Sequence, residues 1–188
     1  EFGKSKSNNK RVLIEYVSSN PTGPLHVGHG RGAVFGSVLS KLMKEAGFQV
    51  DEEYYVNDFG RQMNILASSL WIRYAQIFDK NIKMLKTGYQ GDYIVAIAQN
   101  LKQIRSDELY ECDETIKSLL ENENEEPEKQ TDQIIDSIKY KLNDEFSYIK
   151  DFALKEILEL IKKDLLEFGV DHDSWFSESA LYKGEPND

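Results

Sequence analysis

The sequence predicts an α/β fold in which a parallel sheet is interrupted by a largely helical insertion. Short β-branched and aromatic runs occupy residues 11–17 and 50–56, a pattern typical of strands. An amphipathic segment lies between them, and the order strand, helix, strand favours parallel pairing. A long stretch of helical periodicity then precedes a further strand-like run at residues 170–176.

The composition is that of a globular protein. The chain has 188 residues, of which 40% are hydrophobic and 30% charged, enough for one hydrophobic core. No apolar run approaches the length of a membrane span. A single cysteine, Cys112, cannot form an internal disulfide and indicates a reducing cytoplasm. The net charge of -10 argues against a purely electrostatic nucleic-acid binder.

The first elements follow from local composition. Residues 1–10 are polar and predict a flexible lead-in, without an initiator Met or a signal-peptide pattern, so we expect a cut made inside a longer chain. The strand at residues 11–17 leads into a turn-rich stretch. A helix follows and ends at Gly47. Its apolar residues share one stripe, as in an amphipathic helix: Val27, Val34, Val38, Leu42 and Ala46.

The middle of the chain is predicted to be helical. Apolar residues recur at helical spacing over residues 63–78, from Gln90 onward, and over residues 131–168. A single helix over the last of these ranges would be about 55 Å long, so we expect a break near Asp151. The acidic run at residues 121–128 is interpreted as a solvated linker.

Domain boundaries follow from this pattern. We expect residues 11–62 to form the first half of the sheet domain, and residues 63–169 to form the helical insertion. Residues 170–188 then begin a return to the sheet after Gly169. So few strands make an incomplete sheet, because a doubly wound fold needs more of them to cover its helices.

The turn between the first strand and the first helix contains the clearest candidate site. His26 and His29 lie three positions apart, so they point to one side of the first helical turn. A helix N-terminus presents unpaired N–H groups and favours phosphate. Gly28, between the histidines, lets a ligand approach the backbone. Alternatively, each histidine is a structural residue; a metal site is disfavoured because no third ligand lies nearby.

Longer runs of sequence around these residues resemble the class I arginyl-tRNA synthetases of bacterial type. The run at residues 15–32, EYVSSNPTGPLHVGHGRG, is similar to the signature of that family. Residues 53–62 (EYYVNDFGRQ), 89–94 (YQGDYI) and 173–178 (DSWFSE) are similar to further family segments in the same order. The HxGH tetrapeptide alone is less specific, because other class I synthetases and small nucleotidyltransferases share it.

The resemblance implies a Rossmann-like (HUP-type) fold and an N-terminal part of the catalytic domain. The implied activity joins arginine to the α-phosphate of ATP and then transfers arginyl to tRNA(Arg), with Mg²⁺ accompanying the ATP. The implied enzyme is a cytoplasmic monomer with no membrane partner. His26 and His29 match the catalytic histidines. The residues expected to bind ATP are His26, Gly28, His29 and Gly32.

The same resemblance implies an arginine pocket. Glu15 matches a carboxylate that faces the guanidinium, and Asn20 matches the residue that holds the α-amino group; Ser18 and Ser19 line the same pocket. A carboxylate in an apolar strand is costly without a cationic partner, although an internal Lys or Arg is the alternative partner. Two further residues, Asp58 and Gln62, resemble positions that line the site.

Several family features have no counterpart in the sequence. The Lys- and Ser-rich second signature loop is absent, as are the helical anticodon-binding domain and the N-terminal tRNA-binding domain. We therefore expect the 188-residue chain to be inactive alone. Two alternatives stay open: a freestanding HxGH nucleotidyltransferase, and a non-catalytic interaction module that uses residues 131–168.

Overall fold

The computed structural model describes residue 5 and residues 7–183. It divides into two compact units: unit 1 comprises the residues up to Phe59 and those from Leu158 onward, and unit 2 is Gly60–Ile157. One of the two boundaries between the units falls inside a helix, α6 (Asp144–Glu167). None of the helices within the described ranges has the length and apolar character needed to cross a membrane.

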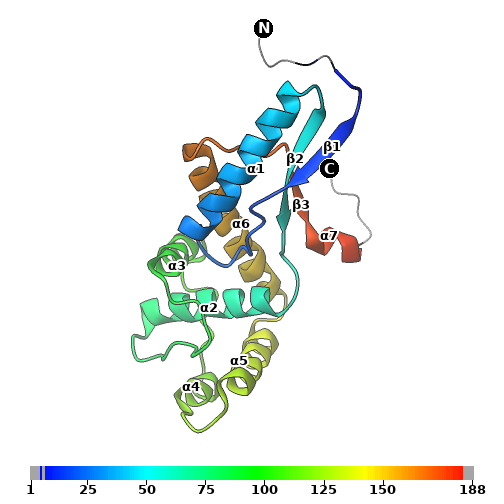
Figure 1. Cartoon of the computed structure of the whole chain (residues 1–188). Helices are drawn as coiled ribbons and strands as arrows, with labels where there is room; N and C mark the ends of the chain where they lie inside the picture. The colour runs from blue at the N-terminus through cyan, green and yellow to red at the C-terminus, as the bar shows by residue number, and fades with distance from the viewer. Residues whose placement is uncertain (1–4, 6, 184–188) are drawn as a thin grey trace. The chain divides into compact units, whose positions relative to one another are not determined.

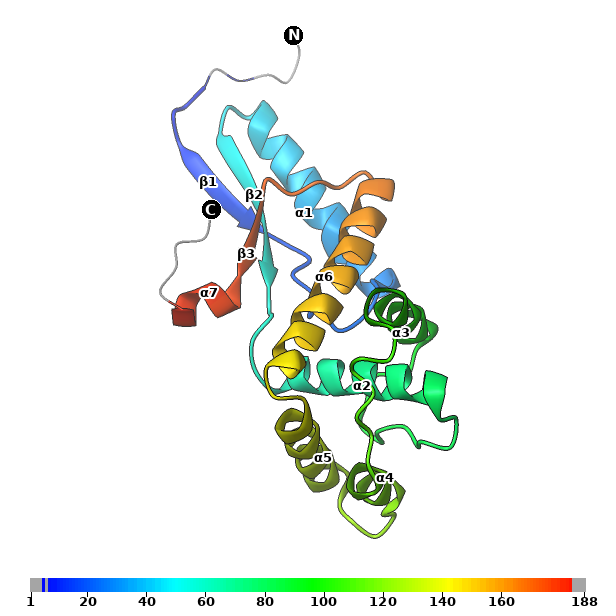
Figure 2. The ribbon, with the colours of Figure 1, turned by 180° about the vertical axis from the view of Figure 1, so that it is seen from behind.

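Unit 1 is built on a parallel sheet, which confirms the predicted α/β class. Within residues 5 and 7–183 the sheet has three strands in the order β1-β2-β3 (Figure 1). Both neighbouring pairs are parallel, and the strands lie side by side in the view from behind (Figure 2). The strands are β1 (Arg11–Glu15), β2 (Gln49–Val56) and β3 (Ser174–Ser177).

The two faces of the sheet differ in what covers them. Glu52 of β2 is 9% exposed and pairs with Lys44 of the preceding helix, α1 (Val27–Glu45), so its face is the covered one. Side chains alternate along a strand, which places Glu53 and Tyr55 on the opposite, uncovered face. Glu15 pairs in register with Glu53 and therefore lies on the uncovered face as well.

The helix α1 (Val27–Glu45) connects β1 to β2, as predicted, but its orientation differs from the usual one. An amphipathic helix ordinarily turns its apolar stripe toward the core. Here the buried residues are small: Ala33, Gly36, Ser37 and Ser40. The apolar stripe is exposed, with Val27 at 94% and Leu42 at 63%. Small side chains are buried because they allow α1 to approach the sheet closely.

The first strand is shorter than the predicted 11–17 and ends at Glu15. Val17 and Ser18 have positive φ angles of 67° and 42°, a left-handed conformation that ends strand geometry. The predicted lead-in at residues 1–10 lies partly outside the described residues. Where it is described, its backbone bonds to the end of the first helix, from Ser5 N to Glu45 O at 3.0 Å.

Unit 2 is built of helices. Its first helix, α2 (Arg61–Phe78), packs against α3 (Asp92–Arg105). Leu66 and Leu70 are fully buried, in agreement with their helical spacing, whereas Ile104 at the end of α3 is 61% exposed. Trp71 is also fully buried, and its indole N–H donates to the Leu109 carbonyl at 2.8 Å.

The second half of the insertion contains a break that the sequence analysis misplaced. Helix α5 (Pro127–Leu142) and helix α6 (Asp144–Glu167) are separated at Asn143 and not near Asp151. Asn143 has a φ of 47°, and asparagine tolerates this left-handed conformation better than most residues. A short helix, α4 (Glu114–Glu121), was not predicted. The acidic linker is therefore shorter than expected, because Pro127 already begins α5.

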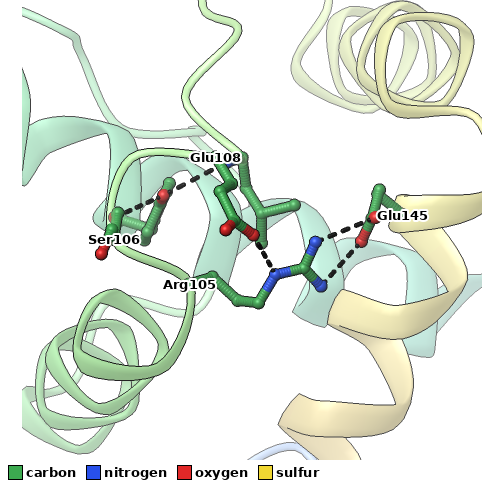
Figure 3. Close-up of polar contacts among 6 residues, drawn as sticks. Arg105, Ser106, Glu108 and Glu145 are labelled. Atoms are coloured by element: carbon green, nitrogen blue, oxygen red, sulfur yellow. Dashed lines mark hydrogen bonds and ion pairs between the residues drawn. The ribbon is translucent and has the colours of Figure 1, made fainter.

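An arginine joins the end of α3 to the start of α6 within unit 2 (Figure 3). Arg105 donates to both carboxylate oxygens of Glu145, at 3.0 and 2.9 Å, and its Nε donates to Glu108 at 2.8 Å. This bidentate geometry suits a guanidinium. These contacts account for Arg105 without a ligand. We therefore interpret it as a structural residue that links α3 to α6 within unit 2.

After Gly169 the chain enters the sheet through β3 (Ser174–Ser177), which pairs with β2. Gly169 has a φ of 80°, which glycine adopts without strain, and it ends the last turn after α6. The strand β3 then covers only part of the expected 170–176 run. The contacts place residues 158–169 with unit 1, although helical spacing gives no sign of a boundary inside α6. Helix α7 (Glu178–Lys183) follows β3, and residues 184–188 lie outside the described part.

Candidate active site

The two histidines of the HxGH motif lie together at the start of α1. His26 is the N-cap residue, and its Nδ1 accepts from the Gly28 N–H at 3.1 Å. The Nδ1 of His29 accepts from the His26 N–H at 3.1 Å. The rings stack with centroids 3.8 Å apart. This reciprocal arrangement satisfies two amides of the first turn with imidazoles in place of the usual hydroxyl and carboxylate.

The hydrogen bonds assign the tautomers of the two rings. Because each Nδ1 accepts a hydrogen bond, Nε2 is the nitrogen of each ring that carries a proton and can donate. Burial, followed by the nearby His26, lowers the pKa of His29. His29 is therefore neutral at pH 7. The two capping bonds use only the Nδ1 atoms, so each Nε2–H can donate to a ligand. A phosphate oxygen at a helix N-terminus is a suitable acceptor.

The glycines in α1 differ in what surrounds them, and so in whether a larger side chain would fit. A Cβ at Gly28 would lie 2.9 Å from Cε1 of His26, so the ring position requires glycine there. A Cβ at Gly36 would overlap the ring of Tyr16, so the residue that follows β1 explains this glycine. At Gly32 a Cβ would meet no atom within 4 Å. Space for a ligand thus remains at Gly32, which is one of the residues predicted to bind ATP.

A small cavity adjoins the histidines within unit 1. It has a volume of about 270 Å³ and is lined by Leu25, His26 and Val27 from the start of α1, and by Leu165 and Phe168 near the end of α6. Its wall includes neither Glu15 nor Asn20. The structure therefore brings His26 and His29 together, but it does not place the predicted arginine-binding residues in the same cavity.

The loop predicted to bind arginine is anchored to β2. Ser18 Oγ accepts from the Tyr55 N–H at 3.0 Å. The Ser19 hydroxyl lies 2.7 Å from the Tyr54 hydroxyl, which in turn donates to the Ser19 carbonyl at 3.1 Å. These bonds hold Val17 and Ser18 in the left-handed conformation, at a cost on the order of 1 kcal/mol each. Such backbone strain is most often found at functional sites.

The two ends of this loop are open to solvent. Glu15 and Asn20 are exposed, and Glu15 is the last residue of β1. A ligand can therefore reach both side chains. The C-terminal ends of parallel strands are where ligands bind in open α/β sheets. The predicted roles of these two residues remain predictions.

The possible site-lining residues are separated by the unit boundary. Asp58 lies in unit 1 at the end of β2, and both of its carboxylate oxygens accept hydrogen bonds from Ser177 and Ser179. Gln62 is an exposed residue in the first turn of α2, in unit 2. The Asp58 contacts were not foreseen, because only register could bring residues so distant in sequence together.

A layer of polar residues beneath α1 was not predicted from the sequence. The Tyr16 hydroxyl donates to Glu52 at 2.7 Å, and Lys44 of α1 pairs with the same carboxylate at 2.5 Å. His172 is 6% exposed and its ring lies 4.3 Å from that of Tyr16. The polar residues in β2 and α1 gave a signal, because a Glu between Val50 and Tyr54 interrupts an otherwise apolar face.

Acidic and imidazole groups within residues 5 and 7–183 form no cluster of three or more suited to hold a metal ion.

The chain matches proteins of one family along most of its length. The family model described as tRNA synthetases class I (R), catalytic domain, matches residues 1–172. An arginine–tRNA ligase of Coxiella burnetii is 46% identical over 97% of the chain and 32% of its own length. One from Hydrogenovibrio crunogenus is 46% identical over 92% of the chain and 31% of its own length. The chain thus spans about a third of these curated relatives.

Solved structures agree with this match. A crystal structure described as an arginyl-tRNA synthetase from Campylobacter jejuni superimposes with a TM-score of 0.75 at 31% identity, over 97% of this chain and 34% of that one. The arginyl-tRNA synthetase of Thermus thermophilus shares the fold, with a TM-score of 0.54 at 20% identity over 97% of this chain and 26% of that one. The resemblance inferred from residues 15–32 is confirmed: this chain belongs to the class I arginyl-tRNA synthetases, as a part of their catalytic domain.

Proposed function

We propose that the chain is part of an arginine–tRNA ligase that activates arginine with ATP and transfers it to tRNA(Arg). A carboxylate oxygen of arginine attacks the α-phosphorus, and the bond to the leaving pyrophosphate breaks. A ribose hydroxyl of the terminal adenosine then attacks the arginyl carbonyl and releases AMP. The observation that carries the proposal is the stacked His26–His29 pair at the N-terminus of α1.

The histidines are proposed to act as hydrogen-bond donors to the phosphates of ATP. Their Nε2–H groups stabilise negative charge that develops during pyrophosphate departure, and the Gly28 and Gly32 backbone lets the phosphates approach α1. Because His29 has a lowered pKa, it donates as a neutral imidazole. No covalent enzyme intermediate is required, so catalysis consists of positioning and charge stabilisation.

The arginine side of the site is proposed to lie at the end of β1. Glu15 would pair with the guanidinium, for which a carboxylate offers a bidentate acceptor, and Asn20 would hold the α-amino group. Ser18 and Ser19 would shape this side, since their hydroxyls bond to β2. We further expect a cytoplasmic monomer, in keeping with the single Cys112.

The test is arginine-dependent exchange between ATP and pyrophosphate. We expect a longer protein containing this chain to show exchange and to charge tRNA(Arg), and the isolated chain to show neither. His29→Ala should lower adenylate formation by about 10²-fold or more. Glu15→Gln should weaken the binding of arginine far more than that of ATP. Asp51→Asn is a matched control, because Asp51 lies on the same face of the sheet but away from the end of β1.

Four other results would contradict parts of this proposal. Charging of another amino acid would contradict the arginine assignment, and equal losses for both ligands in Glu15→Gln would make Glu15 structural. Pyrophosphate release by the isolated chain alone would indicate a freestanding nucleotidyltransferase. A partner that still binds after deletion of residues 1–62 would indicate an interaction module.

A further inference from the structure

Asp58 connects the end of β2 to the junction between β3 and α7. Its Oδ1 accepts from the Ser179 backbone N–H at 2.8 Å. Its Oδ2 accepts from the Ser177 hydroxyl at 2.6 Å and from the Ser179 hydroxyl at 3.2 Å. Three hydrogen bonds thus occupy both oxygens of a half-buried carboxylate, and charged acceptors make such bonds strong.

A second link lies next to the first. The ring of Phe59 stacks on that of Tyr182 in α7, with centroids 4.1 Å apart and planes 16° apart. The backbone then passes through Gly60, whose φ of 90° requires glycine. The residues leaving β2 are therefore attached to α7 by both polar and aromatic contacts, immediately before the chain leaves unit 1.

These links lie beside the uncovered face of the sheet. Tyr55 and Phe176 stack there with ring centroids 5.6 Å apart, and Glu15 lies on the same face through its pairing with Glu53. Glu178 stands between the two serines that Asp58 holds. The position of the end of β3, and of the residues that follow it, thus depends on Asp58.

We propose that Asp58 is a positioning residue that fixes the C-terminal ends of β2 and β3 beside the arginine side of the site and makes no contact with substrate. This inference rests on the proposed function. A carboxylate that already accepts three hydrogen bonds has little capacity left for a guanidinium. Its loss releases Ser177 and Ser179, and a displaced strand end lowers affinity even far from the reacting atoms.

The experiment compares Asp58→Ala, Asp58→Asn and the pair Ser177→Ala/Ser179→Ala in a longer protein that contains this chain. Asp58→Ala and the serine pair should each raise the KM for arginine on the order of tenfold, and combining them should add nothing further. The KM for ATP should stay unchanged. Asp58→Asn should recover most of the loss, because an amide oxygen still accepts from Ser179. Asp51→Ala is the matched control, since Asp51 only forms an exposed ion pair with Arg11.

Two kinetic results would overturn the proposal. If Asp58→Asn is as damaging as Asp58→Ala while the serine pair behaves like wild type, Asp58 binds the substrate directly. If the losses multiply in the combined variant, Asp58 and the serines act independently. Either pattern would remove the positioning role and leave the proposed arginine activity intact.

Amide exchange in the isolated chain separates this inference from the proposed function. Asp58→Ala should speed exchange of the Ser179 amide, and Asp58→Asn should not. Unchanged exchange in Asp58→Ala would refute the link itself. If the longer protein shows no arginine-dependent exchange of pyrophosphate, the proposed function fails, and the positioning of arginine by Asp58 fails with it, whatever the amide exchange shows.

Discussion

Helices α1 and α2 have similar lengths but use their apolar residues in opposite ways. In α2 the apolar positions, among them Leu66, Leu70 and Ile72, are fully buried. In α1 the apolar positions line an open groove on the outer surface, which includes Val34, Val38 and Leu42. Helical periodicity thus shows that a helix has an apolar face, and it does not show which way that face points.

The layers beneath the two helices also differ. The buried residues of α2 include no Asp, Glu, Lys or His. Beneath α1 lie the Glu52 carboxylate, which Lys44 and Tyr16 bind, and the buried ring of His172. The region beneath α1 therefore relies on specific polar contacts, whereas the buried face of α2 is mainly apolar, and the two should respond differently to mutation and to pH.

The largest expected effect is at a buried position of α2. Leu70→Ala should lower the free energy of unfolding by about 2–5 kcal/mol, because it removes buried methyl groups and leaves a cavity. Leu42→Ala, the matched change on α1, should alter it by less than about 0.5 kcal/mol. Chemical denaturation of both variants measures the contrast, and equal losses would mean that the α1 stripe is buried in solution.

A smaller effect is expected where α1 touches the sheet. Gly36→Ala should cost about 1–3 kcal/mol, because its Cβ would overlap the Tyr16 ring. Gly32→Ala should instead stabilise the unliganded chain by up to about 1 kcal/mol. The new Cβ would meet no atom within 4 Å, and alanine favours a helix more than glycine does. Thermal or chemical unfolding distinguishes them. Stabilisation by Gly36→Ala would contradict the close contact between α1 and Tyr16.

The pH dependence of stability should reveal the polar layer beneath α1. Burial lowers the pKa of His172 below its usual 6.5 and outweighs the nearby Tyr16 backbone and carboxylates, which act in the opposite direction. The unfolded chain therefore binds more protons, so stability is full above pH 6.5 and falls as pH drops below it. The charged or titratable neighbours are Glu52, Asp171, Asp173, Tyr16 and Tyr54.

Unfolding experiments between about pH 5 and pH 8 measure this effect. In His172→Phe the free energy of unfolding should depend less on pH than in wild type, while the contacts with the Tyr16 and Tyr54 rings are kept. His29→Asn is the control for the other histidine with a lowered pKa. If wild type and His172→Phe lose stability in parallel as the pH falls, His172 is not the titrating group.

The smallest effect is expected on the outer face of α1. Val38→Ser should change the free energy of unfolding by no more than about 0.5 kcal/mol, because its side chain is 49% exposed. It should also lower the fluorescence of a dye that binds apolar surfaces. The matched change Ile72→Ser, at a fully buried position of α2, should prevent stable folding. A destabilised Val38→Ser variant would show that the groove is closed in solution.

Local sequence determined the kind and order of most elements in this protein. Strand-like runs near Arg11 and Val50, and the glycines at positions 47 and 169, gave the parallel sheet and the helix ends, because propensity and capping act over a few residues. The break at Asn143 and the short helix α4 were not predicted. A continuous helical pattern conceals a single left-handed residue, and an eight-residue helix carries few periodic positions.

Some residues of the candidate site could likewise be predicted from local sequence, and others could not. His26 and His29 were predicted from their spacing at a strand-to-helix turn and from the resemblance of residues 15–32 to a family signature. Tertiary structure alone decided the orientation of α1, the polar layer around Glu52 and the contacts of Asp58 with Ser177 and Ser179. These depend on the register of β2 against β3 and on how closely Gly36 lets α1 approach Tyr16. Such contacts join residues far apart in sequence, and no local pattern encodes them.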